Sequence, residues 1–98
     1  MELRSYYVYL LTNTYNRVLY IGVTNNLYRR IYKHKEGLAR GFTRQYNLHK
    51  LIYYEIYDIA EAGIKREKQL KNWHHDWKLN LAKQANPSLR DISDDFDF

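Results

Sequence analysis

Cysteine is absent from the 98-residue sequence, and proline, with one residue, and glycine, with four, are scarce. The lack of cysteine excludes a disulfide framework and a cysteine-based zinc site. No apolar run approaches the roughly 20 residues of a membrane span. The first twelve residues carry charges and lack the long apolar stretch of a secretory signal. A chain of this length fits one domain, so we expect a single cytoplasmic domain with no membrane contact.

Acidic residues are few outside the last eight positions. Residues 1–90 carry 16 basic and 7 acidic side chains, a net charge of +9, whereas the end of the chain holds four aspartates and no basic residue. A basic body favours a polyanionic partner such as nucleic acid, although a merely soluble basic surface has the same composition. We expect residues 1–90 to form the domain and residues 91–98 to be a disordered acidic tail. A second interpretation is that the tail folds back as a DNA mimic.

Residue patterns predict three strands and three helices. Aromatic and β-branched residues mark the strands, and apolar stripes at helical spacing mark the helices. The segment 37–48 reads as a basic loop. The order β-β-α-β-α-α predicts an α+β fold with a small three-stranded antiparallel sheet flanked by about three helices. The expected strands are 5–11, 17–23 and 50–57, and the expected helices are 27–36, 59–73 and a third one that ends near residue 84.

Ionisable side chains interrupt the apolar stripes of two predicted helices. Arg30 and His34 fall on the stripe of Ile31, and Glu67 falls on the stripe of Leu70. Such groups are costly to bury unless they are paired or bind a ligand. The alternative is that they sit at the edge of the stripe and extend toward water.

Two tyrosine-rich triplets lie on the first two strands: Tyr7-Val8-Tyr9 and, eleven positions later, Tyr20-Ile21-Gly22. Arg30 follows Tyr20 by ten positions, His34 comes next, and Glu67 lies on a later helix. This arrangement resembles the GIY-YIG nuclease family, and in particular its stand-alone, single-domain members. The resemblance covers about residues 5–77. The first triplet departs from the family pattern, because Tyr7 replaces its glycine.

The resemblance implies a DNA endonuclease that uses Mg²⁺ or Mn²⁺. Glu67 would be the sole protein ligand of the metal, and Arg30 would grip the scissile phosphate. Tyr9 or Tyr20 would take a proton from water, and we favour Tyr9 as the base with Tyr20 as its positioning partner. His34 would bond a phosphate oxygen or relay a proton.

Further basic and polar residues are candidates for DNA contact. Arg40, Arg44 and Lys50 surround the basic loop and would follow a DNA backbone; a solvated loop is the alternative. Asn86 matches an asparagine that completes the family site late in the chain, although Asn80 competes for that position and Asn86 precedes a proline in a possible turn.

Two other functions fit the same sequence. One is a non-catalytic nucleic-acid-binding module on the same fold, against which a retained Glu67 argues, since a binder has no need of a carboxylate facing a phosphate. The other is the protein-interaction domain in which the acidic tail mimics DNA. We expect a role in DNA repair or recombination. The preferred DNA structure, the oligomeric state and any protein partner for targeting stay open.

Overall fold

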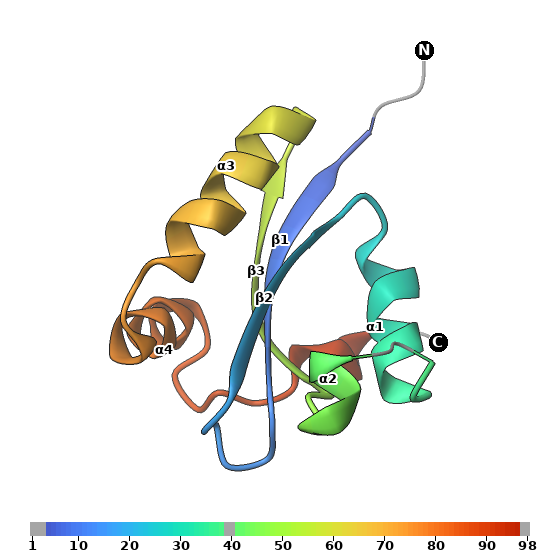
Figure 1. The fold of residues 1–98 in the computed structure, drawn as a ribbon, viewed down its shortest axis with the longest axis vertical. Coiled ribbons are helices and arrows are strands. Elements are labelled where there is room, and N and C mark those ends of the chain that lie inside the picture. The colour runs from blue at the N-terminus through green and yellow to red at the C-terminus, as the bar shows by residue number, and fades with distance from the viewer. Residues whose placement is uncertain (1–3, 39–40, 97–98) are drawn as a thin grey trace.

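The computed structural model describes residues 4–38 and 41–96 as a three-stranded antiparallel sheet between helices (Figure 1). The strand order is β2-β1-β3, with β1 in the centre. This confirms the predicted α+β fold and the order of its main elements. The strands are β1 (Tyr6–Thr12), β2 (Leu19–Thr24) and β3 (Lys50–Tyr57); the helices are α1 (Leu27–Lys35), α2 (Phe42–Gln45), α3 (Ala60–Lys71), α4 (His75–Ala85) and the 3₁₀ helix η1 (Ile92–Asp95).

The sheet separates two hydrophobic clusters, because successive side chains of a strand point to opposite faces. Figure 1 looks toward β2, with α3 and α4 on one side of the sheet and α1 and α2 on the other. The α3–α4 side is built on Val8, Leu10, Ile21, Ile52, Leu70, Ala82 and Leu89. The α1 side is built on Tyr9, Leu11, Leu27, Ile31, Leu48 and Leu51.

The structure differs from the sequence expectation in the segment 37–48. That segment is not loop throughout, because α2 forms within it after Gly41, whose φ of 86° suits a residue without a side chain. Thr43 of α2 is buried and bonds to α1 through His34, which ties the segment to the domain. Within the described ranges, no helix is long and apolar enough to cross a membrane.

The acidic end of the chain is a second difference. Residues 91–96 are not a frayed tail: they pack against β3, and Ser93 is only 1% exposed. The carboxylate of Asp91 accepts hydrogen bonds from the Leu51 N–H at 3.1 Å and from the Ser93 N–H and hydroxyl, and it pairs with Lys35 at 2.6 Å. These contacts offset the cost of ordering the segment, which composition alone does not reveal. Residues 97 and 98 lie outside the described ranges.

We predict that Asp91→Ala destabilises the domain by about 2–3 kcal/mol, because it leaves the part-buried Leu51 N–H and the Lys35 ammonium without their acceptor. Asp94→Ala removes an exposed charge from the same segment and should change stability by less than about 0.5 kcal/mol. Urea unfolding of both variants measures the difference. Equal stability of the two variants would contradict the docking role given to Asp91.

Candidate active site

Tyr9 lies on the central strand, directly opposite Gly22 of β2. Its side chain is 2% exposed, and the end of its ring lies over the Gly22 backbone. A Cβ atom at position 22 would fall 2.4 Å from both Cζ and the hydroxyl oxygen of Tyr9. Glycine is therefore required at position 22 for steric reasons, because any side chain there would overlap the Tyr9 phenol.

Three rings meet at this point from three elements. The ring centroids of Tyr9, Tyr20 and His34 are pairwise 6.2 Å apart, and the rings are tilted by 50° to 58°. Tyr9 comes from β1, Tyr20 from β2 and His34 from the last turn of α1. The structure thus brings together one tyrosine from each triplet, Tyr9 and Tyr20, and the histidine that follows them in the sequence.

His34 is held as a neutral ring. Its Nδ1 lies 3.1 Å from the Thr43 hydroxyl of α2, and its Nε2 is buried with no hydrogen-bond partner among the described residues. Burial, the larger cause, and the nearby Arg30 guanidinium together lower the pKa of His34 to about 4. At neutral pH the ring therefore carries no charge and has one nitrogen free for a ligand.

Burial shifts the pKa of Tyr9 in the opposite direction to that of His34. It raises the pKa of the Tyr9 phenol well above its ordinary value, the neighbouring Tyr20 hydroxyl raises it further, and the Arg30 charge only partly counters these effects. Tyr9 is thus protonated at neutral pH and poised to donate a hydrogen bond. This opposes our expectation that Tyr9 is the base.

Arg30 is exposed on α1, and its charge reaches both Tyr9 and His34. Helix α1 starts at Leu27, where the Asn26 side chain accepts a hydrogen bond from the Arg29 N–H at 3.0 Å. A polar hollow of about 240 Å³ lies at this end of the helix. It is lined by Thr24, Asn25, Asn26, Arg29, Arg30 and Lys33, so three cationic side chains border one small depression.

Glu67 lies on α3, on the other side of the sheet from α1. The helix comes close to the sheet at Gly63, where an added Cβ would be 3.5 Å from Val23 of β2. One turn later Glu67 is only 8% exposed, and its charge raises the pKa of Tyr9. The Lys71 ammonium lies 2.5 Å from Glu67 Oε1, although that oxygen has no partner in hydrogen-bonding geometry. Through its effect on the pKa of Tyr9, the Glu67 carboxylate of α3 is electrostatically linked to the tyrosine site.

Glu67 fits a metal ligand by its chemistry. In the part of the chain that the structure describes, no three His, Cys, Asp or Glu side chains gather in one place. A site with one buried carboxylate suits Mg²⁺, which keeps several waters and takes oxygen ligands from a phosphate. Glu67 Oε1 contacts the Lys71 cation without a hydrogen bond, so a metal cation could take the place of that contact.

The other predicted contact residues divide into three cases. Arg44 is exposed on α2 and Lys50 is half-buried at the start of β3, whereas Arg40 lies outside the described residues. Asn86 is 7% exposed, and its amide donates to the Ile52 carbonyl at 3.0 Å and the Arg90 carbonyl at 2.8 Å. The Asn86 side chain therefore holds the C-terminal segment, and its contact with DNA stays a prediction.

Sequence reasoning missed three neighbours of the site. Thr43 bonds to His34, and Phe42 stacks on Tyr20 with centroids 6.4 Å apart. Both come from α2, which the loop prediction did not contain. Lys71 stands four positions after Glu67, a helical spacing that was visible in the sequence.

Comparison with known proteins identifies the family to which this chain belongs. A family model described as the GIY-YIG catalytic domain matches residues 5–80, which puts the chain in a nuclease class. The chain is a member of the GIY-YIG family.

Its relatives include small proteins named UPF0213. One from Clostridium perfringens is 36% identical over 80 residues, covering 82% of this chain and 85% of the relative. Another, from Syntrophus aciditrophicus, is 35% identical over 82 residues, covering 83% of this chain and 92% of the relative. The solution NMR structure of a UPF0213 protein from Bacillus halodurans has a TM-score of 0.52 and 26% identity, covering 82% of this chain and 84% of that chain.

We predict that Gly22→Ala costs about 1–3 kcal/mol of stability, because the new methyl group forces the Tyr9 ring out of its place. In a Tyr9→Leu background the ring is gone, and the same substitution should cost much less. A double-mutant cycle by urea unfolding measures this coupling. An equal cost of Gly22→Ala in both backgrounds would show that the ring does not set the requirement for glycine.

The lowered pKa of His34 predicts a pH-dependent effect on stability. Between the ordinary value of 6.5 and about 4, the unfolded chain takes up a proton that the folded ring resists, so native stability falls as the pH falls through this range. His34→Gln removes that loss. The stability difference between wild type and variant should therefore shift by about 1 kcal/mol in favour of the variant from pH 7 to pH 5, after allowance for partial exposure of the ring.

Chemical unfolding at the two pH values tests this expectation. Carboxylates whose pKa is lowered, such as those of Glu55 and Asp91, lose their contribution only at more acidic pH. A difference between wild type and His34→Gln that stays constant from pH 7 to pH 5 would contradict the neutral, desolvated state of His34.

Proposed function

We propose that this protein is a divalent-metal-dependent endonuclease that hydrolyses DNA phosphodiester bonds. The observation that carries the proposal is the meeting of Tyr9, Tyr20 and His34 at 6.2 Å, with the charges of Arg30 and Glu67 acting on Tyr9. Phosphodiester hydrolysis needs proton transfer from water, neutralisation of phosphoryl charge and a cation on the reacting oxygens. In this proposal the tyrosines and His34 transfer the proton, Arg30 neutralises phosphoryl charge and Glu67 binds the cation.

Glu67 is the protein ligand for Mg²⁺ or Mn²⁺ in this proposal. When bound, such an ion supplies Lewis-acid stabilisation of the phosphoryl oxygens. Burial of the carboxylate in α3 fixes its direction, and its Oε1 contacts the Lys71 ammonium without a hydrogen bond, a contact that an ion could replace. The remaining coordination would come from water and the substrate phosphate.

Arg30 binds the scissile phosphate. Its guanidinium is exposed to substrate, and a planar fork matches two phosphate oxygens. Arg29 and Lys33 border the same hollow, so they are placed to hold a neighbouring phosphate of the backbone. Two or three cations on one side of the rings would orient a strand across the site.

The two tyrosines have different roles. Tyr9 stays protonated and donates to the Tyr20 hydroxyl, which lies among the causes of the raised pKa of Tyr9. Tyr20 is half-buried and therefore closer to solvent than Tyr9, so we assign the proton acceptance from water to Tyr20. Neutral His34, with Nε2 unused, takes the hydroxyl proton of Tyr20 as Tyr20 accepts one from water, or it bonds a phosphate oxygen.

The alternative of a non-catalytic DNA-binding module shares the cationic hollow but gives no use to Glu67. A buried carboxylate lowers the affinity of a site for phosphate, so a pure binder would do better without it. We therefore favour catalysis and assign the protein to DNA repair or recombination, where branched and supercoiled DNAs are the substrates to compare.

We predict that Glu67→Gln lowers the cleavage rate at least a hundredfold in Mg²⁺ or Mn²⁺, because the amide keeps the shape but loses the charge that binds the ion. DNA binding should persist, since the cations of α1 are untouched. The assay uses supercoiled plasmid and branched oligonucleotides with each ion and with EDTA. Glu61→Gln, an exposed position of the same helix, is the matched control. Near-normal cutting by Glu67→Gln, or cutting by wild type in EDTA, would overturn the proposal.

A further inference from the structure

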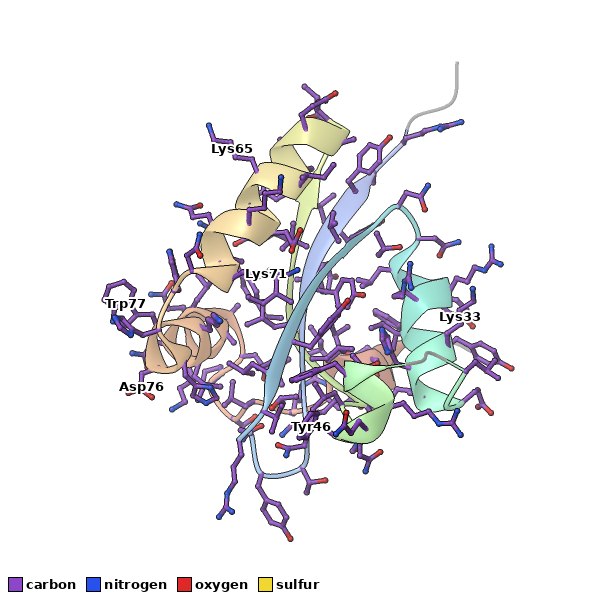
Figure 2. All side chains as sticks on the ribbon, in the orientation of Figure 1. Lys33, Tyr46, Lys65, Lys71, Asp76 and Trp77 are labelled. Atoms are coloured by element: carbon purple, nitrogen blue, oxygen red, sulfur yellow. The ribbon has the colours of Figure 1, made fainter. Side chains whose placement is uncertain are left out.

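Lys71 is the immediate neighbour of the candidate metal ligand. It leaves α3 one turn after Glu67, and Figure 2 labels it at the end of that helix, on the side toward β2. Its ammonium is 2.5 Å from Glu67 Oε1. The two side chains differ sharply in exposure: that of Lys71 is 56% exposed and that of Glu67 is 11% exposed. An exposed cation therefore lies against a buried anion.

The contact between Lys71 and Glu67 is not built like the structural ion pair on the same helix. Arg66 binds both oxygens of Glu55 at 2.9 and 3.0 Å, and the same carboxylate also accepts from the Tyr53 and Tyr57 hydroxyls. Lys71 by contrast meets one oxygen outside hydrogen-bonding geometry. A half-exposed lysine held by one such contact is released at little cost.

The charges around Glu67 do not favour a dication in the absence of DNA. The Glu67 carboxylate faces the Lys71 ammonium directly, and the Arg30 and Glu67 charges both act on Tyr9. Both positive charges repel an incoming metal ion. A DNA phosphate reverses this balance, because it adds negative charge and offers the ammonium a second anionic partner. The Lys71 ammonium can then pair with the phosphate when the ion replaces it on the Glu67 carboxylate.

We propose that Lys71 makes metal binding at Glu67 depend on DNA: its ammonium occupies the carboxylate in the free protein and transfers to a substrate phosphate when ion and DNA bind together. This inference rests on the proposed function, since it takes Glu67 as the metal ligand. Linkage requires the coupling to be reciprocal, so Mn²⁺ strengthens DNA binding by the same factor by which DNA strengthens Mn²⁺ binding.

The test measures the Kd for Mn²⁺ from the free-ion electron paramagnetic resonance signal, with and without a phosphorothioate DNA that resists cleavage. We expect DNA to tighten Mn²⁺ binding by wild type about tenfold or more. Lys71→Gln should bind Mn²⁺ about tenfold more tightly than wild type without DNA, the size of effect expected for one nearby charge. Its gain on adding DNA should shrink accordingly.

Two control variants separate the position from the charge. Lys71→Arg keeps a cation at the site and should retain the DNA-dependent binding of wild type. Lys68→Gln removes one exposed positive charge from the same helix and should leave the Mn²⁺ affinity unchanged.

The outcomes distinguish this inference from the proposed function. If Lys71→Gln has the wild-type Mn²⁺ affinity without DNA, or the full wild-type gain with DNA, the role of Lys71 is wrong, while loss of Mn²⁺ binding in Glu67→Gln still supports the metal site. If Glu67→Gln binds Mn²⁺ as wild type does, the metal assignment itself fails and Lys71 loses its role with it.

Discussion

The packing of the Tyr9 ring over Gly22 is the constraint on which the site depends. Tyr9 belongs to the central strand and is held by neighbours on both sides, so its position follows from the register of the sheet. Gly22 leaves the space that the phenol fills. Because the ring is enclosed, its hydroxyl stays protonated, and the ring lies against those of Tyr20 and His34. The two tyrosine triplets of the sequence are therefore one structural unit.

The sheet edge explains how groups from opposite faces act together. Helix α1 follows β2 directly and carries Arg30 and His34, whereas α3 packs against the other face and carries Glu67. Since β2 is an edge strand, α3 can bring a carboxylate within electrostatic reach of Tyr9 without crossing the core. A cation-rich face and a buried carboxylate thus lie on opposite faces of the sheet, and the proposed function requires a phosphate and an ion to join them.

Much of this arrangement was predictable from the sequence, for physical reasons that differ by element. Alternating aromatic strands fix the sheet, and helical spacing correctly put Glu67 on the buried stripe of Leu70. The sequence failed where tertiary contacts override composition. Asp91 looked like part of a solvated acidic tail, yet its carboxylate accepts from the Leu51 backbone. The sequence also did not reveal that the Asn86 amide donates to two backbone carbonyls.

The central claim is that one ion binds at Glu67 beside the tyrosine–histidine cluster while Arg30 holds the phosphate. A crystal structure with Mn²⁺ and phosphorothioate DNA tests it most directly, because anomalous scattering locates the ion independently of the protein density. The account predicts one Mn²⁺ on the Glu67 carboxylate, a phosphate between the ion and Arg30, and the Tyr20 hydroxyl facing that phosphate. An ion bound elsewhere, or DNA seated away from α1 with Glu67 still paired to Lys71, would contradict the account.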